Sequence, residues 1–335
     1  MSNAIEIEGV TKTFGPKVAV SNISLAVPQG SLYGFIGPNG AGKSTTIRMI
    51  MSILFPDSGR IRVLGRESAM ESKDRIGYLP EERGLYRKMR VQAFLEYMAK
   101  LKGVDSGADL TSRVKSWLDR IGLGDVARKK CQELSKGMQQ KVQFVSSILH
   151  DPDLVILDEP FSGLDPVNAR LMRDLIDDLH KAGKTIIFST HVMSHAEQIC
   201  DHIIMINRGH KVLDASIGRI AQDYDPRMVY MQPAREVSPD EVRGMAGVAK
   251  VEAVMNAGSV GGLNVGLAHG VAPETLIATL AGKFPLKRIE QVRASLEDIF
   301  IDQVLSAGGE TPDGAAALRA SVREGAAGKQ GAGHE

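Results

Sequence analysis

Apolar residues in the first two thirds of the chain form two kinds of pattern, short continuous runs and longer segments with helical spacing. Leu32–Ile36 is a run of strand length, whereas residues 45–54 carry apolar side chains at the spacing of one helix face. The same two patterns predict strands at 61–64, 76–79, 154–157, 185–189, 202–206 and 210–214, and helices at 166–182 and 216–224. Strands that alternate with helices in this way indicate an α/β fold with a parallel sheet.

Two segments depart from this alternation. Residues 5–27 alternate apolar and polar positions in two stretches, which predicts an antiparallel flap beside the parallel core. From 91 to 150 the pattern is helical, which predicts a helical subdomain inserted between two strands of the core sheet. Ser135 precedes the last helix of this insertion and is a candidate N-cap.

The pattern changes again at residues 224–226 (Tyr-Asp-Pro), where we place a domain boundary. Residues 227–304 mix short strands with two helices, which predicts a small α+β domain. The strands are expected at 229–231, 248–254, 263–267 and 289–292, and the helices at 273–283 and 295–305. Residues 306–335 are rich in Gly, Ala and polar residues, so we expect a disordered tail. The predicted domains are therefore 1–224 and 225–305, followed by this tail.

The amino-acid composition limits the kinds of partner and the cellular setting that we expect for this chain. The chain has 335 residues, 43% of them hydrophobic, which allows two domains with substantial cores. Its 41 basic and 40 acidic residues leave a formal charge of +1, so nothing indicates a nucleic-acid partner or an anionic membrane surface. Two cysteines, Cys131 and Cys200, suggest no disulfide framework, and a reducing cytoplasm is the simplest setting. The sequence shows neither a signal peptide nor an apolar run of about 20 residues, so a membrane process would need a second chain.

The segment Gly37-Pro-Asn-Gly-Ala-Gly-Lys-Ser44 fits the phosphate-binding pattern G-x-x-x-x-G-K-[ST]. It lies between a predicted strand and a predicted helix, which is the context that this loop requires. Glycines let the backbone turn its N–H groups inward, and the following helix offers its positive end to a polyphosphate. Lys43 is expected to reach the β- and γ-phosphates of a nucleotide, and Ser44 to hold Mg²⁺. The expected nucleotide contacts are Gly37, Pro38, Asn39, Gly40, Ala41, Gly42, Lys43, Ser44 and Thr45.

Ionisable residues follow two of the predicted strands directly. Asp158 and Glu159 end the apolar run at 154–157, at the edge of an open α/β sheet where ligands bind. Asp158 is a candidate Mg²⁺ ligand, and Glu159 a candidate base for an attacking water. His191 follows the strand at 185–189 and is a candidate contact to the γ-phosphate, to which an uncharged ring could donate one hydrogen bond. The alternatives are a capping pair of carboxylates and a surface or core histidine.

The order of these motifs resembles the nucleotide-binding subunit of an ATP-binding-cassette (ABC) transporter over residues 4–224. The resemblance extends to an adenine-stacking aromatic, a Q-loop, a signature, a D-loop and a switch histidine. These are matched by Phe14, Glu81, 134–138 (Leu-Ser-Lys-Gly-Met), 162–165 (Ser-Gly-Leu-Asp) and His191. Phe14 lies between the first two predicted strands, where an aromatic either stacks on a base or packs within the loop.

The chain departs from the usual ABC motifs at two places. Lys136 and Met138 replace a glycine and a glutamine in the signature, and Glu81 replaces the Q-loop glutamine. Both departures resemble the branch of bacterial sodium-efflux and drug-efflux ATPase subunits, an ABC-2 type of exporter. Residues 77–86 and 295–300 also resemble that branch, the latter its extra C-terminal domain.

The resemblance implies a mechanism and partners. A second copy of the chain would stack head to tail, with ATP between the phosphate-binding loop of one copy and the signature of the other. Nucleotide contacts are then implied for Ser135, Lys136, Gly137, Met138, Asp165 and Glu81, with Glu81 also near Mg²⁺. A membrane-spanning permease would carry an unnamed cargo outward, and this chain would lie at the cytoplasmic face of the inner membrane. The alternatives are a soluble ABC ATPase that acts on a macromolecular complex, an importer subunit, and a module that binds ATP without turnover.

Overall fold

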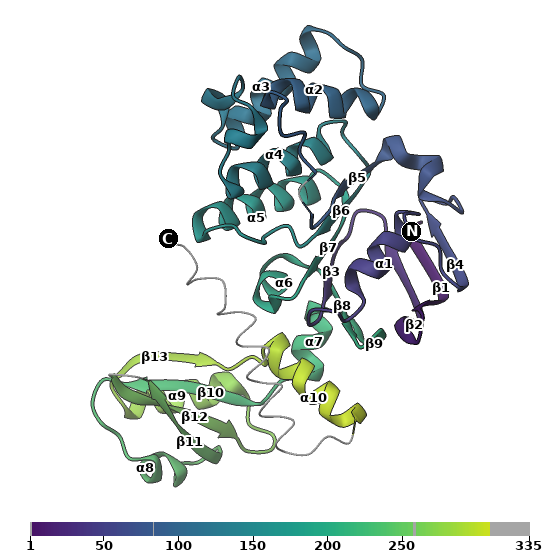
Figure 1. Ribbon diagram of the computed structural model, residues 1–335. Helices are drawn as coiled ribbons and strands as arrows, with labels where there is room; N and C mark the ends of the chain where they lie inside the picture. Colours follow the sequence, from purple (N-terminus) through teal and green to yellow (C-terminus); the bar gives the residue numbers. More distant parts are fainter. Residues whose placement is uncertain (1, 83, 257–258, 309–335) are drawn as a thin grey trace. The chain divides into compact units, whose positions relative to one another are not determined.

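The computed structural model describes the chain except residues 1, 83, 257–258 and 309–335 (Figure 1). Its contacts divide it into two compact units, which are described separately here. The first comprises Met1–Ile217 together with the segment that begins at Phe300, and the second comprises Gly218–Ile299. The division by contacts therefore falls seven residues before the boundary expected at residues 224–226. The expected tail lies almost wholly outside the described residues.

A six-stranded sheet organises the first unit. Its spatial order is β5 (Ile76–Leu79), β6 (Leu154–Asp158), β7 (Thr185–Thr190), β3 (Leu32–Ile36), β8 (His202–Asn207) and β9 (His210–Ser216). The strands are parallel except β9, which pairs antiparallel with β8. The predicted parallel core is thus confirmed, and the carboxyl ends of β3, β6 and β7 lie next to one another at one edge of the sheet.

A second sheet of three antiparallel strands forms the predicted flap. It contains β2 (Lys17–Pro28), β1 (Asn3–Phe14) and β4 (Ser58–Val63), in that order. Phe14 is the last residue of β1 and pairs with Lys17, so its expected position between two strands is wrong. The hairpin needs only two further residues at its turn, and the strands therefore extend past the apolar positions that predicted them.

One apolar cluster joins the two sheets through helix α1 (Lys43–Ile50). Ile5 of the flap, Ile47 of α1 and Ile156 of β6 all belong to it and are fully buried. The helix begins two residues before the predicted segment and ends four residues earlier. The residues that follow Ile50 keep an apolar pattern because several of them still pack against this core.

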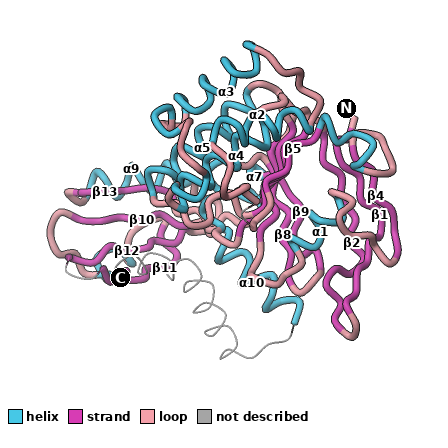
Figure 2. Tube along the Cα trace, turned by 45° about the horizontal axis from the view of Figure 1, so that its top comes forward, coloured by secondary structure: helices cyan, strands magenta, loops and turns pink. Residues whose placement is uncertain are grey.

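The predicted helical insertion is confirmed and lies together on one side of the unit in Figures 1 and 2. It contains α2 (Val91–Leu101), α3 (Ala108–Arg120) and α4 (Lys136–Ile148), with short 3₁₀ turns between them. Ser135 caps α4 as expected, because its Oγ accepts a hydrogen bond from the Met138 backbone N–H at 3.3 Å. The unit also contains α5 (Pro166–Lys181) and α6 (Met193–Ile199), of which α6 was not predicted. The predicted helix α7 (Ile217–Asp223) begins at the division between the two units.

The second unit has the order β-α-β-β-α-β. Its elements are β10 (Met228–Pro233), α8 (Pro239–Arg243), β11 (Val248–Asn256), β12 (Ser259–Leu267), α9 (Pro273–Lys283) and β13 (Leu286–Gln291). The strands form an antiparallel sheet in the order β11-β12-β10-β13, which is the ferredoxin-like arrangement. The small α+β domain was predicted, whereas the five-residue helix α8 was not. Helix α10 (Leu296–Gly308) follows and extends three residues beyond its expected end.

Candidate functional site

The phosphate-binding loop connects the end of β3 to the start of α1. Gly37 (φ 149°) and Gly42 (φ 112°) adopt backbone conformations that other residues rarely take. A Cβ atom on Gly37 would lie 2.1 Å from the Ile206 carbonyl oxygen, and one on Gly42 would lie 2.5 Å from the Ala19 carbonyl oxygen. The glycines at these two positions are therefore required by the loop's path as well as by its chemistry.

Lys43 folds back over this loop. Its Nζ donates to the carbonyl oxygens of Gly37 (2.8 Å) and Pro38 (3.1 Å), and only 5% of the residue is exposed. Burial lowers the Lys43 pKa, and the nearby carboxylates of Glu159, Asp158 and Glu81 oppose this shift. Two neutral carbonyls are weaker partners for an ammonium group than a phosphate is, so the side chain is placed to exchange them for a polyphosphate.

Asp158 is fully buried at the end of β6. Its Oδ1 accepts hydrogen bonds from Ser44 Oγ (3.0 Å) and Ser189 Oγ (2.5 Å). Burial raises the Asp158 pKa, and these two hydrogen bonds oppose that rise. Within the described part of the chain, Oδ2 is buried and has no hydrogen-bond partner.

These two oxygen ligands fit a magnesium ion that also binds phosphate. Mg²⁺ in such sites takes one or two protein oxygens, with substrate phosphates and waters completing its shell. The unpaired Oδ2 of Asp158 and the hydroxyl of Ser44 supply donors of that kind. The described residues contain no group of three or more His, Cys, Asp or Glu side chains that could hold a metal without a ligand's help.

Glu159 has a left-handed backbone conformation (φ 50°), which is uncommon for a residue with a side chain. Ser189 holds it there, because the Glu159 N–H donates both to the Ser189 hydroxyl (3.0 Å) and to the Ser189 carbonyl (3.2 Å). The Glu159 Oε1 then lies 2.9 Å from His191 Nδ1 and 3.9 Å from Lys43 Nζ. The backbone turn thus brings the carboxylate between the candidate histidine and the phosphate-binding lysine.

The contact between His191 and Glu159 constrains how the histidine can act. If Nδ1 donates its proton to the carboxylate, the neutral ring has no second N–H, and Nε2 can only accept. We expected an uncharged ring that donates to the γ-phosphate. In this arrangement the ring needs a second proton to donate there while it holds Glu159.

The structure brings together Lys43, Ser44, Asp158, Glu159 and His191 beside the phosphate-binding loop. Glu81 is near enough for its carboxylate to oppose the lowering of the Lys43 pKa. Phe14 is 48% exposed, and Lys12 Nζ lies 5.7 Å from its ring centroid. Exposed candidates also include Glu81 after β5, Ser135 and Lys136 at the start of α4, and Asp165 at the N-cap of α5. In the described residues, no hydrogen bond or ion pair connects residues 134–138 to the phosphate-binding loop.

We did not predict a role for Ser189 from the sequence, although its position near the end of a strand indicates one. Ser189 is paired with Asp158 in the register of β6 and β7. Parallel strands that end together place their last side chains side by side, so a hydroxyl two residues before His191 was a natural partner for Asp158.

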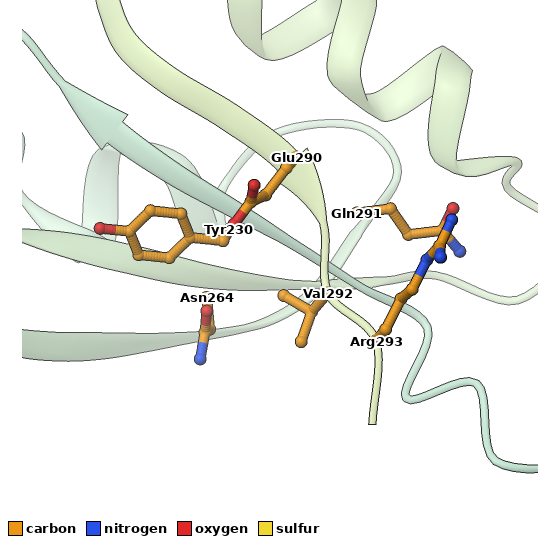
Figure 3. A pocket seen from close by; sticks show the side chains of 6 residues that line it. All are labelled: Tyr230, Asn264, Glu290, Gln291, Val292 and Arg293. Carbon is orange, nitrogen blue, oxygen red and sulfur yellow. The ribbon is translucent and has the colours of Figure 1, made fainter. Parts of the chain in front are cut away.

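A separate pocket of about 630 Å³ opens on the second unit. It is lined by Tyr230, Asn264, Glu290, Gln291, Val292 and Arg293, which come from β10, β12 and the end of β13 (Figure 3). None of these residues belongs to the motifs above, and the phosphate-binding machinery is contained in the first unit.

Two families match different parts of the chain. Residues 20–162 match the ABC transporter family, and residues 219–304 match the C-terminal domain of ATP-binding proteins similar to DrrA1-3. No helix in the described part of the chain is both long enough and apolar enough to cross a bilayer.

Known proteins resemble the chain over most of its length. It is 38% identical to the uncharacterized ABC transporter ATP-binding protein YhaQ of Bacillus subtilis, over 90% of this chain and 98% of YhaQ. It is 37% identical to the bacitracin transport ATP-binding protein BcrA of Enterococcus faecalis, over 66% of this chain and 71% of BcrA. The solved structure of an ATP-binding subunit of an ABC transporter superimposes with a TM-score of 0.60 at 27% identity, covering 66% of this chain and 93% of that one. With its phosphate-binding loop, paired carboxylates and DrrA-like C-terminal domain, the chain belongs to the ABC transporter ATP-binding proteins, which hydrolyse ATP to power transport.

Proposed function

We propose that this chain powers export through a separate membrane-spanning permease, and that two copies close head to tail around Mg-ATP and reopen after hydrolysis. The observation that carries the proposal is the cluster of Lys43, Ser44, Asp158, Glu159 and His191 at adjoining strand ends. Each chemical role that phosphoryl transfer to water needs in cis has a side chain in this cluster. The chain would lie at the cytoplasmic face of the inner membrane, held there by the permease.

The side chains of the cluster divide the work of hydrolysis. Lys43 would leave its two carbonyl partners and neutralise charge on the β- and γ-phosphates. Mg²⁺, held by Ser44 and Asp158, would supply further charge neutralisation on the phosphate oxygens. Glu159 would orient a water molecule and accept its proton, and His191 would fix the position of Glu159 through the 2.9 Å contact.

The second copy would complete the site. The signature residues lie at the N-terminus of α4, where unpaired backbone N–H groups and the helix dipole favour an anion. Ser135 and Lys136 are exposed, and the signature residues have no described hydrogen bond to this chain's own phosphate-binding loop, which supports action on the partner's ATP. Ser135, Lys136 and the backbone at Gly137 would then contact the γ-phosphate across the interface.

Export is favoured over import by the second unit. Its match to the C-terminal domain of DrrA1-3-like ATP-binding proteins, and the similarity of the chain to the bacitracin transport ATP-binding protein BcrA, support an exporter of the drug-efflux kind. The acidic residue at Glu81 supports the same branch, as does Lys136 in the signature.

Light scattering of Glu159→Gln at increasing ATP concentrations tests the closed dimer. The variant keeps a side chain of the same shape and can still contact His191, but it cannot accept a proton from water. We expect it to bind ATP and to accumulate as a dimer, whereas the wild-type protein with Mg²⁺ hydrolyses ATP and returns to monomers. If Glu159→Gln binds ATP and remains monomeric at saturating nucleotide, the proposed mechanism is wrong.

A further inference from the structure

Two buried glutamines on α4 connect this helix to both loops that flank the candidate site. Gln140 and Gln143 are 3% and 5% exposed and share one helix face, because they are three residues apart. Gln140 Nε2 donates to the Pro160 carbonyl at 3.3 Å, directly after Glu159. Gln143 Nε2 donates to the Glu82 carbonyl at 3.1 Å, directly after Glu81. Figure 1 shows α4 beside β5 and β6, the strands from which these two loops leave.

The C-terminal half of α4 is seated tightly on β5. A Cβ atom on Gly77 would lie 2.2 Å from the Ser147 carbonyl oxygen, so the strand and the helix backbone touch there. Beyond the helix end, a His150 ring nitrogen lies 3.2 Å from the Ile76 carbonyl. With the helix fixed at Ser147, a displacement of either loop would act mainly on the part of α4 that precedes this residue, which carries both glutamines and the signature.

The hydrogen bonds of Gln143 indicate a role other than packing. Its Oε1 is buried and has no hydrogen-bond partner in the described residues. A buried amide that is only half satisfied is costly, and an apolar side chain of the same size would fill the space without that cost. What the amide adds at this position is its N–H donor toward the loop of Glu81.

We infer that Gln143 is a positioning residue that couples ATP binding at one subunit's phosphate-binding loop to the orientation of the signature which that subunit offers to its partner. The coupling runs from the loop of Glu81 through the Glu82 carbonyl and Gln143 into α4, and so to Ser135 at its N-cap. Gln140 makes the corresponding connection from the segment after Glu159. The inference rests on the proposed function, because it presupposes the ATP-driven pairing of two copies.

The test uses the full chain in the Glu159→Gln background, where the dimer is expected to accumulate. Gln143→Met removes the donor and keeps an unbranched side chain of similar length. We expect the ATP concentration for half-maximal dimerisation to rise about fivefold or more, at the low end of coupling between sites. Binding of a fluorescent ATP analogue to monomers at low protein concentration is expected to stay within about twofold, because the Gln143 side chain bonds to the Glu82 carbonyl and, in the described residues, to no residue of the phosphate-binding loop.

Arg113→Met is the matched control. Arg113 Nη1 donates to the Leu149 carbonyl at 3.1 Å, so this variant also removes a side-chain hydrogen bond to α4, at the end away from the signature. It is expected to lower the melting temperature and to leave the dimerisation midpoint unchanged. If Gln143→Met does not fold, Gln143→Leu serves instead, since it also lacks a donor for the Glu82 carbonyl and places no charge at this buried position.

The outcomes separate this inference from the function on which it rests. Equal dimerisation midpoints for the parent and for Gln143→Met would overturn the inference and leave the ATP-driven dimer intact. An equal shift in Arg113→Met would also overturn it, because general loosening of α4 would then account for the effect. If the parent Glu159→Gln itself fails to dimerise, the proposed function falls, and the inference falls with it.

Discussion

At the scale of single residues, the site consists of buried side chains that each have only one or two hydrogen-bonding groups as partners. Lys43 rests on two carbonyl oxygens, Asp158 on two hydroxyls, and Glu159 on one histidine. Hydrogen-bonding capacity is also left unused in the site. Oδ2 of Asp158, for example, has no hydrogen-bond partner in the described residues. The site is therefore shaped in advance, and ligand atoms can replace or complete its internal contacts.

Lys43→Ala tests the phosphate contact. A charge-assisted hydrogen bond to phosphate is worth more than the two carbonyl contacts it replaces, so ATP affinity is expected to fall about 10- to 100-fold. A nucleotide titration on the folded variant measures this fall. Lys184→Ala is the control, since Lys184 pairs with Asp151 at the surface and is not part of the site. Unchanged ATP affinity in folded Lys43→Ala would show that this loop is not the phosphate-binding site.

Site residues could be predicted from the sequence where a short motif or an adjacent strand indicates their role. Lys43 and Ser44 follow from the spacing of the loop, and Asp158 and Glu159 from their place after a buried strand. The contact between Glu159 and His191 could not be predicted, because it depends on a left-handed backbone at Glu159 whose N–H is held by Ser189 of the neighbouring strand. Phe14 was placed wrongly, because strand pairing extends beyond the apolar residues that reveal it.

At the scale of elements, the parallel strand ends and the helix α4 organise the site. Strands with strong apolar runs, such as β3 and β6, were predicted with bounds within a residue of those in the structure. The short helices α6 and α8 were missed, because seven and five residues are too few to establish a helical period. The close approach of α4 to β5 was also invisible, since a glycine in a strand does not say which element lies against it.

Gly77→Ala tests that close approach. The added methyl group would press on the Ser147 carbonyl, which belongs to the backbone of α4 and cannot rotate away. We expect the free energy of unfolding to fall by about 1–3 kcal/mol, the usual range for overpacking. Urea denaturation compares this variant with Gly218→Ala, where an added Cβ meets nothing within 4 Å. Equal stability of the two variants would show that α4 and β5 do not pack as described.

At the scale of the whole molecule, the chain combines an ATPase unit with a ferredoxin-like unit. The candidate phosphate-binding and carboxylate residues lie within the first unit, and the pocket on the second is lined by none of them. The existence of both units could be predicted from the change of pattern near residue 224. The contacts of the segment after Phe300 with the first unit could not, because nothing in its apolar pattern says where it packs.

A chain that ends at Tyr224 tests how independent the first unit is. We expect it to bind Mg-ATP with the affinity of the full chain, because the candidate site residues up to His191 are retained. Its melting temperature is expected to fall, because the truncation removes Phe300. This residue is fully buried and belongs by its contacts to the first unit. A folded truncation without ATP binding would contradict this division of labour.

We propose that Glu159, and not Glu81, is the base for hydrolysis. Glu159 is held beside His191 and Lys43 at the end of a buried strand, whereas Glu81 is exposed in the loop after β5. Orientation contributes much of the rate that a base provides, and a well-placed base contributes about 10²- to 10⁴-fold. The most direct measurement is the steady-state ATPase rate of Glu159→Gln and Glu81→Gln at saturating Mg-ATP. We predict a loss of about 10²-fold or more for Glu159→Gln and a far smaller loss for Glu81→Gln. A nearly normal rate for Glu159→Gln beside an inactive Glu81→Gln would contradict the account.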